Sequence, residues 1–261
     1  MTSNPYEAPR AVVADYVAPG DSGDFLGEPR SCRAGRAVSW FGDGWNLFSQ
    51  SPGIWILIFL VFMGLMLVSS LVPFFGMLAQ NILFPILTAG VVVGCDAMRR
   101  GEPLEFQHLF TGFSRNSGAL VLLGLLYTVA VVVVLLLAFV PTIGLAGGIA
   151  FIGGDEAGLA EVMGLGFLLG MLVWMALLMP LVMCIWFAPH MVIMHDKQPL
   201  QAMRLSFFAC LKNILPFLLY GLIAAFLAIA ATIPLLLGWL VVGPWFYTST
   251  YMAYRDIFFS D

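Results

Sequence analysis

Long apolar runs without a charged side chain constrain the fold more than any other feature of this chain. Residues 119–140, ALVLLGLLYTVAVVVVLLLAFV, form the cleanest run, and comparable runs cover residues 54–72, 82–95 and 166–194. About 20 largely apolar residues in a helix cross roughly 30 Å of hydrocarbon. A helix also satisfies its own backbone hydrogen bonds, which a lipid environment requires. The runs therefore predict membrane-spanning helices.

A last apolar block, residues 214–254, is about twice as long as one span. Pro234 lies near its middle and predicts a reversal of the chain, so we expect two helices from this block. Together with the four runs before it, the sequence predicts six transmembrane helices. Pro180 and Pro189 fall within the fourth run, which we expect to be kinked at these residues.

The low content of charged residues supports the same class of protein. Charged residues make up 10% of the 261 residues and hydrophobic residues 61%, whereas a soluble domain carries roughly 25% charged residues. So few charges cannot cover the surface of a water-soluble globule of this size. The 11 Lys and Arg residues also form no basic stripe of the kind that tracks phosphates, and we expect no nucleic-acid partner.

The positions of the basic residues predict which ends of the helices face the cytoplasm. Cytoplasmic loops carry an excess of Lys and Arg. With six helices, every basic residue falls on one side, and a Gly-rich loop at residues 141–164 on the other side holds Asp155, Glu156 and Glu161. We therefore expect a multi-pass inner-membrane protein with both termini in the cytoplasm. The basic residues are Arg10, Arg30, Arg33, Arg36, Arg99, Arg100, Arg115, Lys197, Arg204, Lys212 and Arg255.

Two polar stretches about a hundred residues apart read almost alike. MRRGEPLEFQHLFTGFSRN begins at Met98, MHDKQPLQAMRLSFFACLKN begins at Met194, and each precedes a predicted span; a third version, WFGDGWNLFSQSPG, precedes the first span. Each places apolar residues at helical spacing, which predicts an amphipathic helix at the membrane surface. The stripes are Phe41, Trp45 and Phe48; Phe106, Leu109, Phe110 and Phe113; and Leu200, Met203, Phe207, Phe208 and Leu211.

These repeated stretches predict the domain organisation. Residues 1–37, which contain several Pro, Gly and charged residues, are expected to form a flexible cytoplasmic tail. Residues 38–261 are expected to form an all-α membrane domain of six transmembrane helices, arranged as three helical hairpins with cytoplasmic interfacial helices. The repeats are expected at about 38–104, 105–199 and 200–261.

Three sequence segments carry a resemblance to known proteins. They are NPYEAPR near the N-terminus, GWNLFSQSPGIW before the first span, and CDAMRRGEPLEFQHLFTGFSRNSGALVLLGLLY between the second and third spans. From Ala37 onward the chain resembles a family of uncharacterised bacterial inner-membrane proteins known only by a locus-tag name. More loosely, the repeated hairpin is similar to the membrane domain of bacterial glycerophosphodiester phosphodiesterases. The resemblance implies a helical fold and an inner-membrane location, and it implies no activity or site residue.

Charged residues at the span ends, together with aromatic residues of the predicted interfacial helices, form the candidate interaction surface, which we call the cytoplasmic collar. Arg99 or Arg255 could pair with Asp96 or Asp196 there. These charges either anchor and orient the helix ends, which we favour, or form a polar mouth that a substrate uses. The collar comprises Trp45, Phe48, Asp96, Arg99, Arg100, Phe106, Phe110, Phe113, His195, Asp196, Arg204, Phe207, Arg255 and Asp256.

Two histidines, His190 and His195, leave further chemical alternatives open. His195 and Asp196 could move protons as a pair. With Met191, Met194 and Cys184, the same pair could instead bind a soft metal, although ordinary packing is the interpretation we favour. The sequence contains no GxSxG, HExxH, P-loop or Rossmann motif. We therefore expect no enzymatic activity, no metal and no cofactor.

Small residues recur on two predicted spans at a spacing that lets helices approach closely. Gly90 and Gly94 form a GxxxG pair in the second span, and Ala224, Ala228 and Ala231 lie on one face of the fifth. We expect both groups to be packing surfaces.

Two classes of function fit these features. The first, which we favour, is a non-enzymatic membrane adaptor or assembly factor that binds a protein partner through the collar and the tail, within a lipid environment. The alternative is a transporter or channel-like protein for a small or amphiphilic solute. Transport needs a path between the helices, so a polar cavity that reaches past Pro85, Pro180 or Pro244 would favour it. A solid apolar bundle would argue against it.

Overall fold

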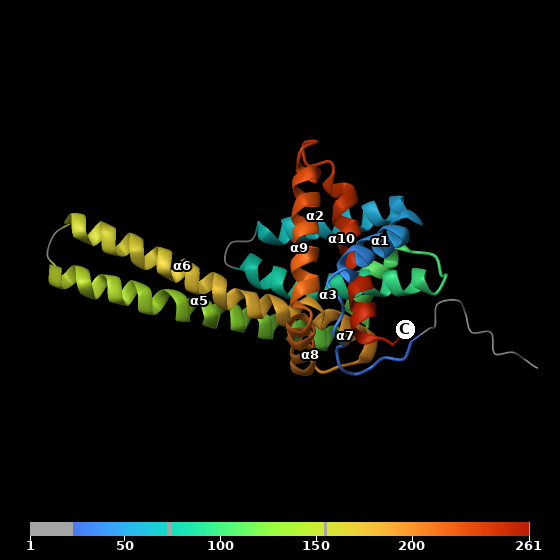
Figure 1. Cartoon of the computed structure of the whole chain (residues 1–261), viewed down its shortest axis with the longest axis horizontal. Coiled ribbons are helices and arrows are strands. Elements are labelled where there is room, and N and C mark those ends of the chain that lie inside the picture. The colour runs from blue at the N-terminus through green and yellow to red at the C-terminus, as the bar shows by residue number, and fades with distance from the viewer. Residues whose placement is uncertain (1–22, 72–74, 154–155, 261) are drawn as a thin grey trace, which may run out of the picture.

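The structure, a computed structural model, describes residues 23–71, 75–153 and 156–260. Within these ranges the chain is folded into helices (Figure 1), and an isolated antiparallel β-bridge joins Phe25 to Phe259. The helices are α1 (Arg36–Ser49), α2 (Pro52–Ser70), α3 (Phe75–Arg99), the 3₁₀ helix η1 (Phe106–Phe110), α4 (Thr111–Ser114), α5 (Ser117–Gly153), α6 (Glu156–Trp186), α7 (Ala188–His195), α8 (Pro199–Lys212), α9 (Ile214–Thr232) and α10 (Trp239–Phe258).

Five helical stretches of the described chain are long and apolar enough to cross a membrane, which confirms the predicted class of all-helical membrane protein. Among them α3 is central, because 56% of its apolar window is buried inside the protein, against 11–22% for the other four. Helices that are apolar all round and yet exposed need an apolar solvent. The five stretches are Pro52–Ser70, Phe75–Arg99, Ser117–Gly144, Met163–His195 and Ile214–Thr232.

The helix α10 is not one of these five, because its second half is polar. Thr248 and Ser249 are completely buried, and Tyr251 and Tyr254 are 1% exposed. The helix thus turns its polar groups toward the interior of the protein, where polar residues of membrane helices are usually found. The chain reverses between α9 and α10 in a turn that contains Pro234, as the sequence predicts.

The fourth apolar run is broken near its end, as its prolines predict. Phe187 separates α6 from α7, and Pro189 lies in the first turn of α7. Proline has no N–H group and cannot bond to the preceding turn. Ser206 of α8 compensates for the break, because its hydroxyl accepts a hydrogen bond from the Phe187 N–H at 2.9 Å and donates one to the Met183 carbonyl at 2.6 Å.

The prediction of a loop at residues 141–164 is wrong, because both neighbouring helices continue through most of this segment. The helices α5 and α6 form a long hairpin, which we call the arm (Figure 1). The 37 residues of α5 span about 55 Å at 1.5 Å per residue, more than the roughly 30 Å of a bilayer core. Contacts along the arm, including the close approach of Gly170 to Thr142 and Phe139, offset the cost of about 1 kcal/mol for each helical glycine. Asp155 lies outside the described residues.

The segment between α3 and α5 does not form the single amphipathic helix that the sequence predicts. It divides into η1 and α4. Leu109 is fully buried, and its carbonyl group lies against Gly90 of α3. Phe106, Phe110 and Phe113 stay on the surface, with 37%, 38% and 46% of each side chain exposed.

The GxxxG pair of α3 is a packing surface, as predicted, but η1 and the loop before it pack there instead of another span. A Cβ atom at Gly90 would overlap the carbonyl oxygen of Leu109, and one at Gly94 would lie 2.9 Å from Cδ1 of Leu104. Gly112 makes the reciprocal contact with the carbonyl oxygen of Ile86 on α3. Glycines at these positions let the two backbones touch directly.

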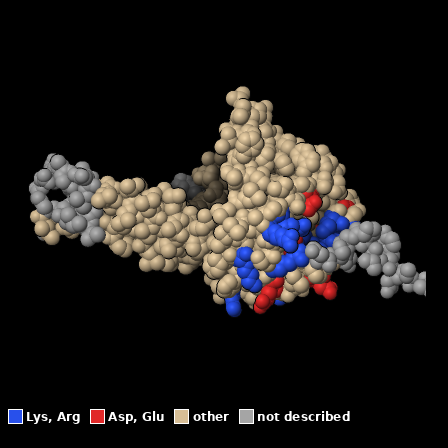
Figure 2. Space-filling view, in the orientation of Figure 1, with Lys and Arg blue, Asp and Glu red and all other residues tan. Residues whose placement is uncertain are grey.

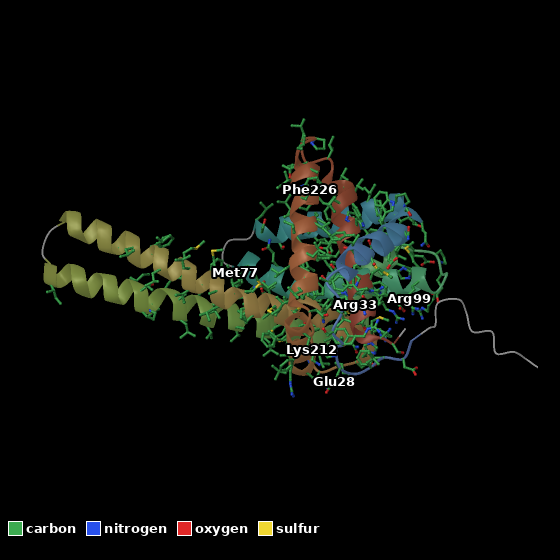
Figure 3. All side chains as sticks on the ribbon, in the orientation of Figure 1. Glu28, Arg33, Met77, Arg99, Lys212 and Phe226 are labelled. Atoms are coloured by element: carbon green, nitrogen blue, oxygen red, sulfur yellow. The ribbon has the colours of Figure 1, made fainter. Side chains whose placement is uncertain are left out.

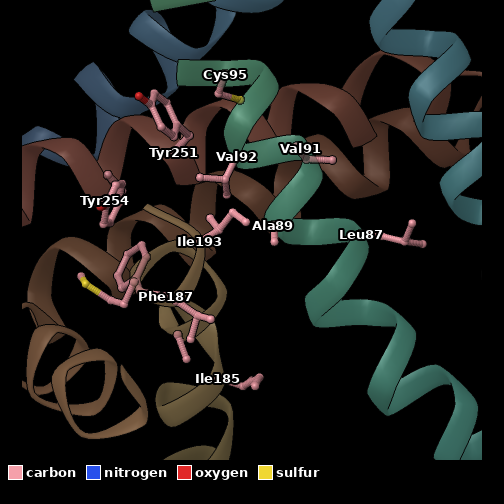
Figure 4. Packing of buried hydrophobic residues seen from close by; sticks show 14 of the residues in the cluster. Leu87, Ala89, Val91, Val92, Cys95, Ile185, Phe187, Ile193, Tyr251 and Tyr254 are labelled. Atoms are coloured by element: carbon pink, nitrogen blue, oxygen red, sulfur yellow. The ribbon is translucent and has the colours of Figure 1, made fainter. Parts of the chain in front are cut away.

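The core lies where α3, α7 and α10 meet. Figure 4 shows Ala89 and Val92 of α3 on the side that faces Ile193 of α7, with Tyr251 of α10 beyond them. Ala89 and Ile193 are completely buried, and Val92 is 2% exposed. This core joins helices of different hairpins, so it fixes the positions of the hairpins relative to one another.

Candidate functional site

Charged side chains gather at one end of the molecule, which we call the charged end. Figure 2 shows Lys, Arg, Asp and Glu concentrated there, whereas the tan part of the arm and the turn between α9 and α10 show none in this view. Figure 3 places Arg33, Arg99 and Lys212 at this end and Phe226 of α9 away from it. Arg10 lies outside the described residues. The charges are therefore separated from the apolar helices as the sequence predicts.

Asp256 is the centre of one cluster at the charged end. Its carboxylate accepts hydrogen bonds from Arg30 at 2.8 Å, from Arg36 at 2.7 Å and from Nε1 of Trp40 at 2.6 Å. The Asp256 side chain is 5% exposed. Hydrogen bonds to an ionised acceptor are stronger than those between neutral groups. Asp256 thus joins the end of α10 to α1 and to the segment before it.

The segment 23–35 was expected to belong to a flexible tail, but it is bound along the charged end. Backbone hydrogen bonds join Leu26 to Phe258 and Arg30 to Ile257, both at 2.9 Å. The amide of Asn213, which is completely buried, adds a bond to the Arg30 carbonyl at 2.9 Å. Residues 1–22 of the predicted tail lie outside the described residues.

Asp96 is the centre of a second cluster. It accepts a hydrogen bond from the Tyr251 hydroxyl at 2.8 Å, and Arg99 and Arg100 approach it to 3.4 and 3.1 Å. The expected pair of Arg99 and Asp96 is therefore present, within one span end. The cluster joins the end of α3 to α10.

His195 and Asp196 have different partners. Nε2 of His195 lies 2.6 Å from the Tyr254 hydroxyl, and its ring stacks on Phe25 at a centroid distance of 3.6 Å. Asp196 accepts a hydrogen bond from the Asn116 amide at 2.5 Å. The described residues contain no group of three or more His, Cys, Asp or Glu that could hold a metal ion. These contacts join α7 to α10 and to the base of the arm.

The remaining collar residues divide between the core and the surface. Phe48 is buried, whereas Trp45 is 42% exposed and packs against Trp245. Arg255 lies over the Phe259 ring, with its guanidinium carbon 3.6 Å from the ring centroid. On α8, Arg204 lies over the Phe208 ring in the same way, at 5.8 Å, and Phe207 packs against Phe208.

Phe106, Phe110 and Phe113 form an exposed aromatic cluster on η1 and α4. The ring centroids of Phe106 and Phe110 are 5.6 Å apart, and those of Phe110 and Phe113 are 6.2 Å apart. Structure and sequence agree that these three rings lie at the surface, on the segment that connects two spans.

A cavity of about 1250 Å³ lies among the membrane helices. Residues of α2, α3, α5, α6, α7, α9 and α10 line it, so every predicted span contributes to its wall. Figure 2 shows the surface hollowed between the arm and the α9–α10 hairpin. Pro85 lies in the wall of this cavity, and Pro244 lines a smaller neighbouring pocket. The helices do not form a solid bundle.

Three polar atoms of residues in the cavity wall have no hydrogen-bond partner among the described residues. They are Oγ1 of Thr88, Nδ1 of His190 and Nε1 of Trp186. Thr88 is 7% exposed and His190 is 2% exposed. An unpaired buried polar group costs about 1–3 kcal/mol, and nearly all such groups in folded proteins are bonded. These three unpaired groups belong to residues that line the cavity.

Sequence reasoning considered His190 but missed Thr88. A signal was available, because Thr88 lies three residues after Pro85 and His190 directly follows Pro189. A polar residue beside a proline in an apolar run is typical of the broken helices that line solute sites. Ala224, which was expected to lie in a packing surface, lies in the cavity wall.

The fold and the cavity define a helical membrane protein with several candidate spans and an open space between them. A comparison with known proteins shows which family it is in. The chain is 30% identical over 199 residues to "Probable inner membrane protein BTH_II0599" of Burkholderia thailandensis, and the match covers 74% of this chain and 73% of that protein. The chain therefore belongs to this family of inner-membrane proteins, as the resemblance in the sequence implies. No protein-family model matches the chain, and no solved structure matches it.

Proposed function

We propose that this inner-membrane protein binds a small or amphiphilic solute between its helical hairpins and carries it through the membrane. The observation that supports the proposal is the cavity of about 1250 Å³, whose wall holds unpaired polar atoms of Thr88 and His190. Interrupted helices near such groups are common in transporters. The break at Phe187 supplies one such interruption, and Pro85 of the cavity wall removes a backbone hydrogen-bond donor within α3.

The proposal includes six spans, with α10 as the sixth. This helix has 20 residues, follows α9 after a turn, and buries its polar residues against the other helices. An even number of spans leaves both termini and the charged end in the cytoplasm, as the excess of basic residues favours. The hairpins α2–α3, α5–α6 and α9–α10 each follow a shorter helical segment, and we treat them as three repeats around the cavity.

Filling the cavity tests the proposed function. Ala224 lines the cavity, whereas Ala225, the next residue of α9, is exposed and does not line it. Ala224→Phe should displace a bound molecule, and Ala225→Phe is the matched control. Both variants and the wild type would be purified from native membranes in mild detergent, and the retained lipids and small amphiphiles quantified by mass spectrometry. We expect A224F to lose a molecule that A225F retains, and equal retention would contradict the proposal.

An adaptor role is a second candidate, because the aromatic cluster of Phe106, Phe110 and Phe113 is exposed beside the charged end. Aromatic residues are enriched where proteins bind one another. Replacing all three with Ser should release a co-purifying protein while the spans still insert. Val38→Ser, at a residue of α1 that is 58% exposed, is the control. Unchanged co-purification would remove this candidate.

A further inference from the structure

We infer that the solute is an uncharged lipid-like molecule whose oxygen-bearing end group lies against Thr88 and His190. The inference rests on the proposed function and names the chemical class of the molecule that the cavity admits. It follows from the charge of the wall, the kind of polar atom left unpaired, and the size of the space.

The charge of the wall excludes an ionic head group. No Asp, Glu, Lys or Arg of the described chain lines the cavity. A phosphate or carboxylate placed there would lose its hydration without gaining a counter-ion, which is strongly unfavourable. The acidic and basic residues of α3 and α10 instead pair with one another at the charged end. A molecule that enters the cavity is therefore uncharged.

The unpaired atoms call for a ligand that accepts hydrogen bonds. The indole Nε1 of Trp186 is a donor only, and the hydroxyl of Thr88 is a donor as well as an acceptor. Nδ1 of His190 takes either role, depending on the tautomer. Ester, carbonyl, ether and hydroxyl oxygens satisfy all three residues, so the end group contains oxygen.

The positions of Thr88 on α3 and His190 on α7 place these two residues at a similar level of the cavity. Val92 and Ile193 face one another across α3 and α7 (Figure 4). Thr88 precedes Val92 by one helical turn, and His190 precedes Ile193 by about one turn of α7. Trp186 precedes His190 by four residues. One end group can therefore contact more than one of these side chains.

Most of the remaining wall is apolar and fits hydrocarbon, although Gln80 and Asn81 also line it. The cavity of about 1250 Å³ is larger than the roughly 300–1,000 Å³ of small-molecule pockets. Its wall also includes Phe84, Met63 and Met66, and Leu236 of the α9–α10 turn. Methionine side chains adapt to chains of varying shape. The hollow between the arm and the α9–α10 hairpin (Figure 2) gives a lipid direct entry from the bilayer.

Two lipids that differ only in charge test the inference. Dioleoylglycerol and dioleoyl phosphatidic acid have the same acyl chains, and only the second carries a phosphate. Binding to the purified full chain would be measured by native mass spectrometry after removal of endogenous lipid. We expect dioleoylglycerol to bind at least tenfold more tightly. Equal or tighter binding of phosphatidic acid, or no binding of either lipid, overturns the inference.

A variant of Thr88 and a matched control test where the end group of the lipid lies. Thr88→Val keeps the shape of the side chain and removes its hydroxyl, and we expect it to weaken dioleoylglycerol binding at least fivefold. The control is Thr142→Val, because the Thr142 hydroxyl bonds to its own helix and does not line the cavity. Equal weakening by both variants, or none by T88V, contradicts the inference. Its failure remains distinct from failure of the proposed function, because A224F reports whether any amphiphile occupies the cavity.

Discussion

Replacing Asp256 with Asn should weaken the attachment of residues 23–35 to α10. The buried bond from Trp40 to the ionised carboxylate contributes about 1.5–3 kcal/mol. The side chains of Arg30 and Arg36 are 31% and 46% exposed, so solvent screening limits their joint contribution to about 1 kcal/mol. Asn keeps one acceptor oxygen but no charge, and its NH₂ group faces donors. We therefore expect a loss of about 2–3 kcal/mol in the free energy of unfolding.

Two assays report on this loss. For a chain of this size, 1 kcal/mol shifts the melting temperature by roughly 2–4 °C, so D256N should melt about 5–10 °C below the wild type in detergent. Limited proteolysis should also cleave the N-terminal segment faster, because its anchor is weakened.

Asp43→Asn is the matched control for D256N. Asp43 lies on the exposed face of α1, and its substitution should leave both readouts within about 1 °C and twofold of the wild type. If D256N melts and is cleaved like D43N, the Asp256 cluster does not hold the N-terminal segment, and this reasoning is refuted.

Two further predictions concern backbone packing and thiol chemistry. Gly90→Ala should lower the free energy of unfolding by about 1–3 kcal/mol, because its Cβ would overlap the Leu109 carbonyl. The control is Gly64→Ala, in open space on α2, which should melt at or above the temperature of the wild type. Equal melting temperatures for the two variants would contradict the close contact at Gly90. Burial and the nearby Asp256 carboxylate raise the pKa of Cys32 from 9.0 to about 11. In a variant with the other cysteines replaced by Ser, maleimide labelling of Cys32 should therefore rise about tenfold per pH unit from pH 7 to 10, and a plateau near pH 9 would show that the pKa is not raised.

The sequence predicts the class of fold because lipid requires long apolar helices, and such runs are visible without any tertiary information. The break at Phe187 was predictable for a similar reason, since a proline acts on the turn that precedes it. The concentration of charge at one end follows from the order of spans and loops.

Other features depend on contacts between distant residues and could not be predicted. The bonds from Arg30 and Arg36 to Asp256 join the two ends of the described chain. The segment at residues 106–114 divides into η1 and α4, and Leu109 is buried where its backbone meets Gly90 of α3, a contact that the local sequence does not reveal. The arm extends because its two helices stabilise each other, which overrides the helix-breaking tendency of glycine.

The cavity was the least predictable feature. Its wall draws residues from seven helices, and the sequence contains no intramembrane charge to mark it. Thr88 and His190 contribute unpaired polar atoms to the wall, and each is a polar residue within an apolar run. Their significance depends on the absence of a bonding partner among the described residues, which only a three-dimensional arrangement reveals.

An experimental structure of the full chain in lipid nanodiscs made from native membranes tests the central claim most directly. The account predicts an open space between the arm and the α9–α10 hairpin. It also predicts elongated density there that ends within hydrogen-bond distance of Thr88 or His190. A closed interface, with α9 packed against the arm and no density between them, would contradict it.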